Sequence, residues 1–125
     1  MKTTSYEISK QLKEAGFDAE TNFYWYCYDN GREMRHIADA DGKGDVEAYD
    51  LETILDALPA FIEHNNITYD LWLWNDGIGY YPNYDKYSGE GVYNMENGIY
   101  EFSDNKSLAD TAGRMWLELK EKNLL

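Results

Sequence analysis

Three dipeptides of Asn or Asp followed by Gly constrain the fold of this chain more than any other feature. They are Asn30-Gly31, Asp76-Gly77 and Asn97-Gly98, and each lies between runs of strand-forming residues. Both residue types tolerate the positive φ angles of a two-residue hairpin turn. Each dipeptide therefore predicts two consecutive antiparallel strands. The sheet structure of the protein is expected to be antiparallel.

The first hairpin is predicted to place one face in the core. Asn22–Tyr28 is rich in aromatic residues and has no helical stripe, which favours a strand. A two-residue loop at Asn30-Gly31 would pair Cys27 with Met34 and Trp25 with His36. The expected core face then holds Phe23, Trp25, Cys27, Met34 and His36, and the opposite face holds Tyr24, Tyr26, Tyr28, Arg35 and Ile37.

Alternation predicts the strand before the second hairpin. In Ile67–Trp74, one face carries Ile67, Tyr69, Leu71 and Leu73, and the other carries Thr68, Asp70, Trp72 and Trp74. Asp76-Gly77 leads into a strand at Ile78–Tyr81, which Pro82 places at an edge or stops early. The third hairpin joins Val92–Met95 to Ile99–Phe102.

Two segments before the second hairpin have the caps and periodicity of helices. Thr4 and Glu7 form a capping box at the start of the first helix, and Gly16 is suited to its end. Asp50 is a good cap for the second helix, and Pro59 should end or bend it. The apolar surface of that helix continues into an expected last turn at Phe61 and Ile62. The acidic stretch 39–49 before it is expected to be a loop.

The third helix is predicted from Ser107 to Lys122, with Ser107 and Asp110 as its capping box. Gly113 inside it weakens the helix, which indicates close packing onto the sheet. The expected order is α-β-β-α-β-β-β-β-α in a single domain, residues 1–125. We therefore expect an α+β fold with an antiparallel sheet built from hairpins and three helices packed mainly on one face.

Charge narrows the classes of partner. The 125 residues include 24 acidic and 11 basic side chains, a net charge of −13, which repels nucleic-acid phosphates and anionic lipid surfaces. Direct nucleic-acid binding and membrane association are therefore not expected. No apolar run reaches the ~20 residues of a membrane span, and the first residues lack a signal-peptide stretch. The single cysteine, Cys27, is expected to be buried, in a cytoplasmic protein.

Five segments carry a resemblance to a family of small proteins. The segments are Ile8–Phe17, Phe23–Trp25, Tyr49–Pro59, Gly77–Tyr80 and Ser107–Ala112. On these residues the chain resembles proteins of gut Bacteroides-type bacteria and of their phages or mobile elements, a family with no assigned activity. The resemblance implies no site residues, and it hints at an origin in a mobile element.

The acidic segment Asp39–Asp50 is similar to the calcium loop of EF-hands and dockerin modules. Calcium needs six to eight oxygen ligands, and this spacing can wrap a chain around one ion. Lys43, however, places an ammonium at the fifth ligand position. The alternative is a hairpin-to-helix loop in which Asp50 is a cap. Whether calcium binds is left open for Asp39, Asp41, Asp45 and Asp50.

The aromatic residues supply the candidate site. Trp72 and Trp74 share a strand face, and several of the twelve tyrosines follow nearby. Tyrosine and tryptophan are favoured in protein interfaces, whereas amphipathic rings also line the rim of a core. The candidate partner-binding residues are Trp72, Trp74, Tyr80, Tyr81 and Tyr84.

These patterns favour a non-enzymatic protein-interaction module whose partner is another protein or a second copy of the chain. His36 and His64 have no recognisable nucleophile partner, so no catalytic residue, metal or cofactor is assigned. One alternative is a small-ligand or metal-dependent enzyme centred on the Asp39–Asp50 loop. Another is an acidic nucleic-acid mimic that inhibits a DNA- or RNA-binding partner.

Overall fold

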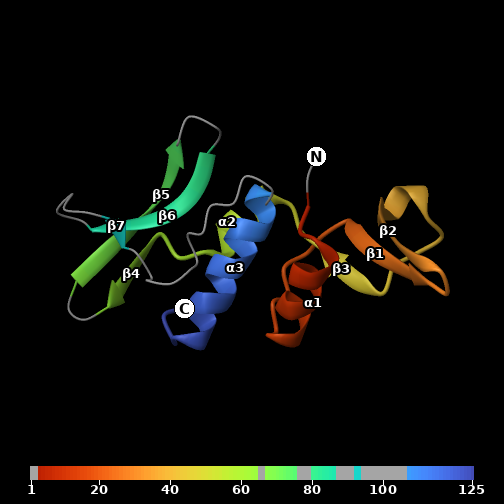
Figure 1. The fold of residues 1–125 in the computed structure, drawn as a ribbon, viewed down its shortest axis with the longest axis horizontal. Helices are drawn as coiled ribbons and strands as arrows, with labels where there is room; N and C mark the ends of the chain where they lie inside the picture. The colour runs from red at the N-terminus through yellow and green to blue at the C-terminus, as the bar shows by residue number, and fades with distance from the viewer. Residues whose placement is uncertain (1–2, 65–66, 76–79, 87–91, 94–106) are drawn as a thin grey trace.

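The computed structural model describes residues 3–64, 67–75, 80–86, 92–93 and 107–125. They form two antiparallel sheets with a layer of helices between them (Figure 1). The first sheet, β2-β1-β3, consists of β1 Phe23–Tyr28, β2 Gly31–His36 and β3 Val46–Ala48. The second, β4-β5-β6-β7, consists of β4 Phe61–His64, β5 Ile67–Asn75, β6 Tyr80–Lys86 and β7 Val92–Tyr93. The helices are α1 Tyr6–Glu14, α2 Leu51–Ala57 and α3 Leu108–Glu121, with a short 3₁₀ turn, η1, at Ile37–Asp39.

The α+β class and the antiparallel hairpins are confirmed, and the element order follows the expected one with two additions, β3 and β4. The strands divide into two sheets instead of one, so the helices lie between sheets. The strand expected at Ile99–Phe102 and the dipeptides Asp76-Gly77 and Asn97-Gly98 lie outside the described residues.

The core lies where the three helices meet. Its fully buried side chains come from all three, and the rings of Phe17, Tyr49 and Trp116 close one end of it with edge-to-face contacts 4.6 and 4.9 Å between centres. Such packing removes apolar surface from water, the main favourable term in folding. The buried helical residues are Ile8, Leu12, Ile54, Ala112, Met115 and Leu119.

Gly113 allows α3 to approach α1 closely. A Cβ atom at this position would lie 2.7 Å from Ile8 Cγ2 and 3.5 Å from Leu12 Cδ1. The expectation of close packing was right, but the neighbour is α1 and not the sheet. A hydrogen bond of 2.7 Å from the Ser5 backbone N to Asp110 Oδ1 joins the same two helices across 105 residues of sequence.

The helix caps follow the sequence at two of three places. Asp50 Oδ1 accepts from Thr53 N at 2.8 Å, and Ser107 Oγ accepts from Asp110 N at 3.1 Å. At α1 the cap is Ser5, so the assignment to Thr4 was wrong. Thr4 is instead fully buried, and its Oγ1 accepts from Tyr49 N at 3.1 Å. This hydrogen bond joins the chain before α1 to the chain after β3.

The second helix ends sooner than expected. α2 stops at Ala57, before Pro59, as the missing proline donor requires. The assignment of Phe61 and Ile62 to a last helical turn was wrong, because both lie in β4, where they pair with β5. The loop expected at 39–49 is also interrupted by β3, whose Val46 and Ala48 are buried against α1.

The first hairpin differs from its predicted register by two residues. Tyr28 pairs with Gly31 and Trp25 with Met34, so the two-residue turn is Asp29–Asn30. Gly31, with φ of +148°, is the first residue of β2. A shift of two keeps every residue on its predicted face. It places Cys27 opposite Arg32 near the tip, where the thiol is exposed, so its predicted burial was wrong.

Candidate functional site

The second sheet has an inner face toward the helices and an outer face away from them. Ile62 on β4 is 3% exposed, and Leu71 on β5 packs against the helical core, which defines the inner face. Phe61, the residue before Ile62, is 63% exposed. It pairs in register with Asp70, so positions 61 and 70 define the outer face. The exposed Phe61 beside the buried Ile62 shows that the outer face is uncovered at position 61.

The strand register divides the five predicted partner-binding residues between the two faces. Positions 72 and 74 alternate with Leu71 and lie on the outer face, and Trp74 pairs with Tyr81. Tyr84 pairs with Leu71 and Tyr80 with Asn75, which places positions 80 and 84 on the inner face. Three of the five positions are thus brought together, and the structure adds Phe61 to them.

All the charged positions of the outer face in the described parts of β4, β5 and β6 are acidic. Glu63 and Asp70 lie on this face beside Phe61, and Asp85 pairs with Asp70 across β5 and β6. No lysine or arginine occupies an outer-face position in the described parts of β4, β5 and β6. On β4, β5 and β6 the outer face is defined here by positions Phe61, Glu63, Thr68, Asp70, Trp72, Trp74, Tyr81, Asn83 and Asp85.

Two carboxylates of the Asp39–Asp50 segment, those of Asp45 and Asp50, accept backbone hydrogen bonds within the fold. Asp45 Oδ2 accepts from Cys27 N at 2.8 Å, which extends the pairing of β1 beyond β3. Asp50 is the cap of α2, and Asp39 ends η1. Across the described residues, no group of three or more His, Cys, Asp or Glu side chains is placed to hold a metal ion. The described geometry therefore favours the interpretation of this segment as a hairpin-to-helix connection in which Asp50 is the helix cap.

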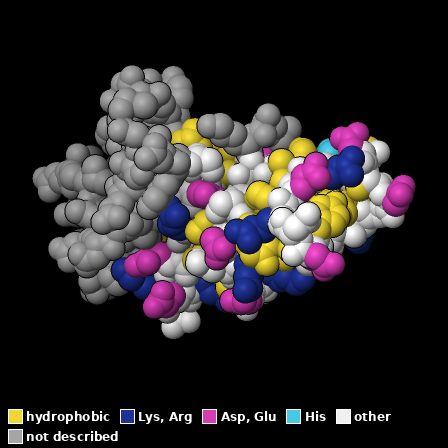
Figure 2. All heavy atoms as spheres, turned by 45° about the vertical axis from the view of Figure 1, so that its right-hand side comes forward, with side chains coloured by type: hydrophobic (Ala, Val, Ile, Leu, Met, Phe, Trp, Pro, Cys, Tyr) yellow, Lys and Arg dark blue, Asp and Glu magenta, His cyan; other side chains and the backbone are white. Residues whose placement is uncertain are grey.

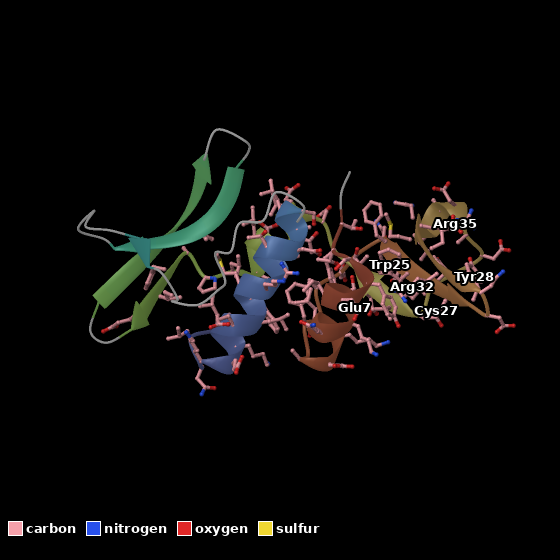
Figure 3. The ribbon with its side chains drawn as sticks, in the orientation of Figure 1. Glu7, Trp25, Cys27, Tyr28, Arg32 and Arg35 are labelled. Carbon is pink, nitrogen blue, oxygen red and sulfur yellow. The ribbon has the colours of Figure 1, made fainter. Side chains whose placement is uncertain are left out.

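A second surface cluster joins α1 to the first hairpin (Figure 3). The Arg32 guanidinium lies 4.1 Å from the centre of the Tyr6 ring and 3.6 Å from Glu7 Oε1. The Tyr6 and Trp25 rings meet edge to face, 6.1 Å between centres. The ion pair itself is exposed, so its contribution to stability is small. Figure 2 shows side chains of both charge signs over this end of the molecule, near β1 and β2.

The structure describes the side chain of one of the two histidines, His36. His36 Nδ1 accepts from Ala38 N at 2.9 Å, and its ring meets Phe23 edge to face, 5.1 Å between centres. These contacts hold the start of η1 against β1, which is a structural role. The side chain of His64 lies outside the described residues.

Tyr49 is the one described side chain with a clearly shifted pKa. It is 2% exposed. Burial raises the pKa of its hydroxyl from 10.0 to about 12, and the carboxylates of Glu47 and Asp18 add to the effect. Ionisation of this buried phenol is therefore expected to weaken the fold at alkaline pH.

We expect the free energy of unfolding to fall between pH 10 and about pH 12 because of Tyr49. In this window the unfolded chain has lost the Tyr49 proton and the folded chain keeps it, so stability falls by up to about 1.4 kcal/mol per pH unit. Below pH 10 the contribution is fully present. Urea unfolding of the protein and of Tyr49→Phe at several pH values measures it. Parallel pH dependences of the two proteins would contradict the assignment.

Within the described residues, no helix is long and apolar enough to cross a membrane. Comparison of the chain with protein-family models, with curated proteins and with solved structures gives no match. The resemblance to proteins of Bacteroides-type bacteria and their phages therefore stays a prediction.

Proposed function

We propose that this chain is a non-enzymatic protein-interaction module that binds a partner protein through the outer face of its second sheet. The observation that carries the proposal is the 63% exposure of Phe61, set against the 3% exposure of its neighbour Ile62. Phe61 extends a surface to which the register adds positions 72, 74 and 81. Aromatic residues are the anchors most enriched at binding hot spots.

The partner is proposed to present a basic surface with an apolar centre. Glu63, Asp70 and Asp85 lie on the outer face at the end that holds Phe61. The whole chain carries a net charge of −13, so its field attracts cationic surfaces and repels anionic ones. Charges of this kind steer the encounter and select the partner, while aromatic burial supplies most of the affinity.

Replacing Phe61 with serine is expected to weaken partner binding by at least about tenfold, as loss of an interface anchor does. The matched control is Tyr28→Ser, because Tyr28 is 53% exposed at the tip of the first hairpin, away from the second sheet. Partners are captured from a cytoplasmic extract of a Bacteroides-type bacterium and identified. Each is then purified and titrated against the protein and the two variants at low and high salt.

The proposal requires a captured protein whose affinity falls with salt and with Phe61→Ser but not with Tyr28→Ser. Equal affinities for the two variants would refute it, as would binding that is insensitive to salt. Duplex DNA added as a competitor separates the remaining alternatives. Displacement of the partner by DNA would identify the protein as a nucleic-acid mimic, whereas undisturbed binding supports a protein-specific contact.

A further inference from the structure

The strand β2 lies at an edge of the first sheet. In the order β2-β1-β3, its one strand neighbour is β1, and the other side of the strand pairs with no described strand. β2 lies at the end of the molecule opposite the second sheet (Figure 1). Gly31, Arg32 and Glu33 are exposed, and the rest of β2 is half-buried. The strand contains no proline. The unpaired N–H and C=O groups of an edge strand are a template for pairing with another strand.

The hydrogen-bond pattern shows which residues of β2 have free backbone groups. Ile37 N donates to Asn22 O at 2.7 Å, and on the other side of β1, Asp45 N donates to Trp25 O at 2.9 Å. Even-numbered residues of β1 therefore bond toward β2. In the observed register, the even-numbered residues of β1 lie opposite the odd-numbered residues of β2. Opposite residues of an antiparallel pair bond to each other or both point away, so the odd-numbered residues of β2 bond to β1. The N–H and C=O groups of Arg32, Met34 and His36 consequently point away from the sheet.

We propose that β2 pairs with β2 of a second copy of the chain, antiparallel and with Met34 on the two-fold axis. Outward-pointing residues must face outward-pointing residues, so the axis passes through a residue of β2 and not between two residues. An axis at Glu33 would oppose two glutamates, and an axis at Arg35 or Arg32 would oppose two arginines. Like charges directly opposite each other destabilise a strand pair.

The axis at Met34 instead pairs opposite charges twice. Glu33 then faces Arg35 of the second copy, and Arg35 faces Glu33 of the second copy. Within one chain, Arg35 Nε already lies 3.8 Å from Glu33 Oε1 on the same face of β2. The two copies together form a square of four charges in which every neighbour has the opposite sign. The backbone groups of Arg32 and Met34 would then find partners as well.

The charge of β2 also favours the approach of two acidic molecules along this edge. Each copy has a net charge of −13, so most approaches between two copies are repulsive. β2 carries two arginines and one glutamate, which makes it a positive segment of an acidic chain. The outer face of the second sheet is not used, so this self-association is separate from the proposed partner binding. A single pair of strands is a small contact, so we expect a weak dimer.

Sedimentation velocity over a range of concentrations tests the pairing with three variants. Arg35→Glu places four carboxylates together, and Glu33→Arg places four guanidinium groups together. Each is expected to weaken dimerisation by at least about tenfold. The double variant with both changes restores the alternation of charges, so it should dimerise like the unmodified protein. Circular dichroism and urea unfolding establish that each variant is folded.

The double variant separates the proposal from an effect on folding. It carries the same two substitutions as the single variants, but the alternation of positive and negative charges is kept. An unmodified protein that stays monomeric at all concentrations would overturn the proposal, and so would a dimer that survives both single changes. A dimer that Phe61→Ser abolishes and Arg35→Glu does not would assign self-association to the outer face of the second sheet and would also overturn it.

Discussion

Replacing Leu12 with alanine is expected to lower the free energy of unfolding by about 3 kcal/mol. Leu12 is 0% exposed, and its side chain lies between α1 and α3 in the centre of the helical core. The change removes buried apolar surface and leaves a cavity that the surrounding helices fill incompletely. Because domains of this kind are stable by about 5–15 kcal/mol, the loss is a large share of the total.

Urea unfolding followed by circular dichroism measures the effect of Leu12→Ala. Gln11→Ala is the matched control, since Gln11 is the preceding residue on α1 and is exposed. That control should change stability by no more than about 0.5 kcal/mol, the usual range for surface positions. A Leu12→Ala protein as stable as the control would show that α1 does not pack into the core as described.

Gly113→Ala is expected to destabilise the protein by about 2 kcal/mol, although alanine is the better helix former by up to about 1 kcal/mol. The new Cβ atom would lie 2.7 Å from Ile8 Cγ2, so α1 and α3 would be forced apart. At an exposed helical position the same substitution would raise stability. The sign of the change therefore reports whether the two helices are in contact.

A second substitution identifies the atom responsible. Ile8→Leu removes the Cγ2 atom and keeps a side chain of the same volume, so Gly113→Ala should cost less in that background. The four proteins form a double-mutant cycle, and we expect a coupling of at least about 1 kcal/mol between positions 8 and 113. Additive effects of the two substitutions would mean that the close approach involves another neighbour.

The helices could be predicted from the sequence because their signals are local. Asp50 and Ser107 are caps whose partners lie three residues away, and Pro59 ends α2 through its own missing donor. The sheets could be predicted less completely. β3 has three residues in an acidic stretch, and its identity as a strand depends on pairing with β1, more than twenty residues earlier. The division of the strands into two sheets also depends on distant contacts.

The candidate site could be predicted in part, because alternation along one strand is a local signal and the pairing of strands is not. Alternation along β5 correctly separates positions 72 and 74 from Leu71, because a strand has a fixed period of two. Nearness in sequence groups Tyr80 and Tyr84 with them, but it does not resolve the two faces of a sheet. The helical pattern places Phe61 in a helix and so hides its place in this site. The signal that could have found it is Pro59, two residues earlier, which ends α2.

The hydrogen bond from Ser5 to Asp110 has a consequence for how a ribosome makes this protein. α1 emerges first, but the helix that covers its apolar side follows 105 residues later. At about 5–20 residues per second, translation takes on the order of ten seconds to add that length. During that interval Ile8 and Leu12 have no α3 to pack against, so the nascent chain presents them to water and to chaperones.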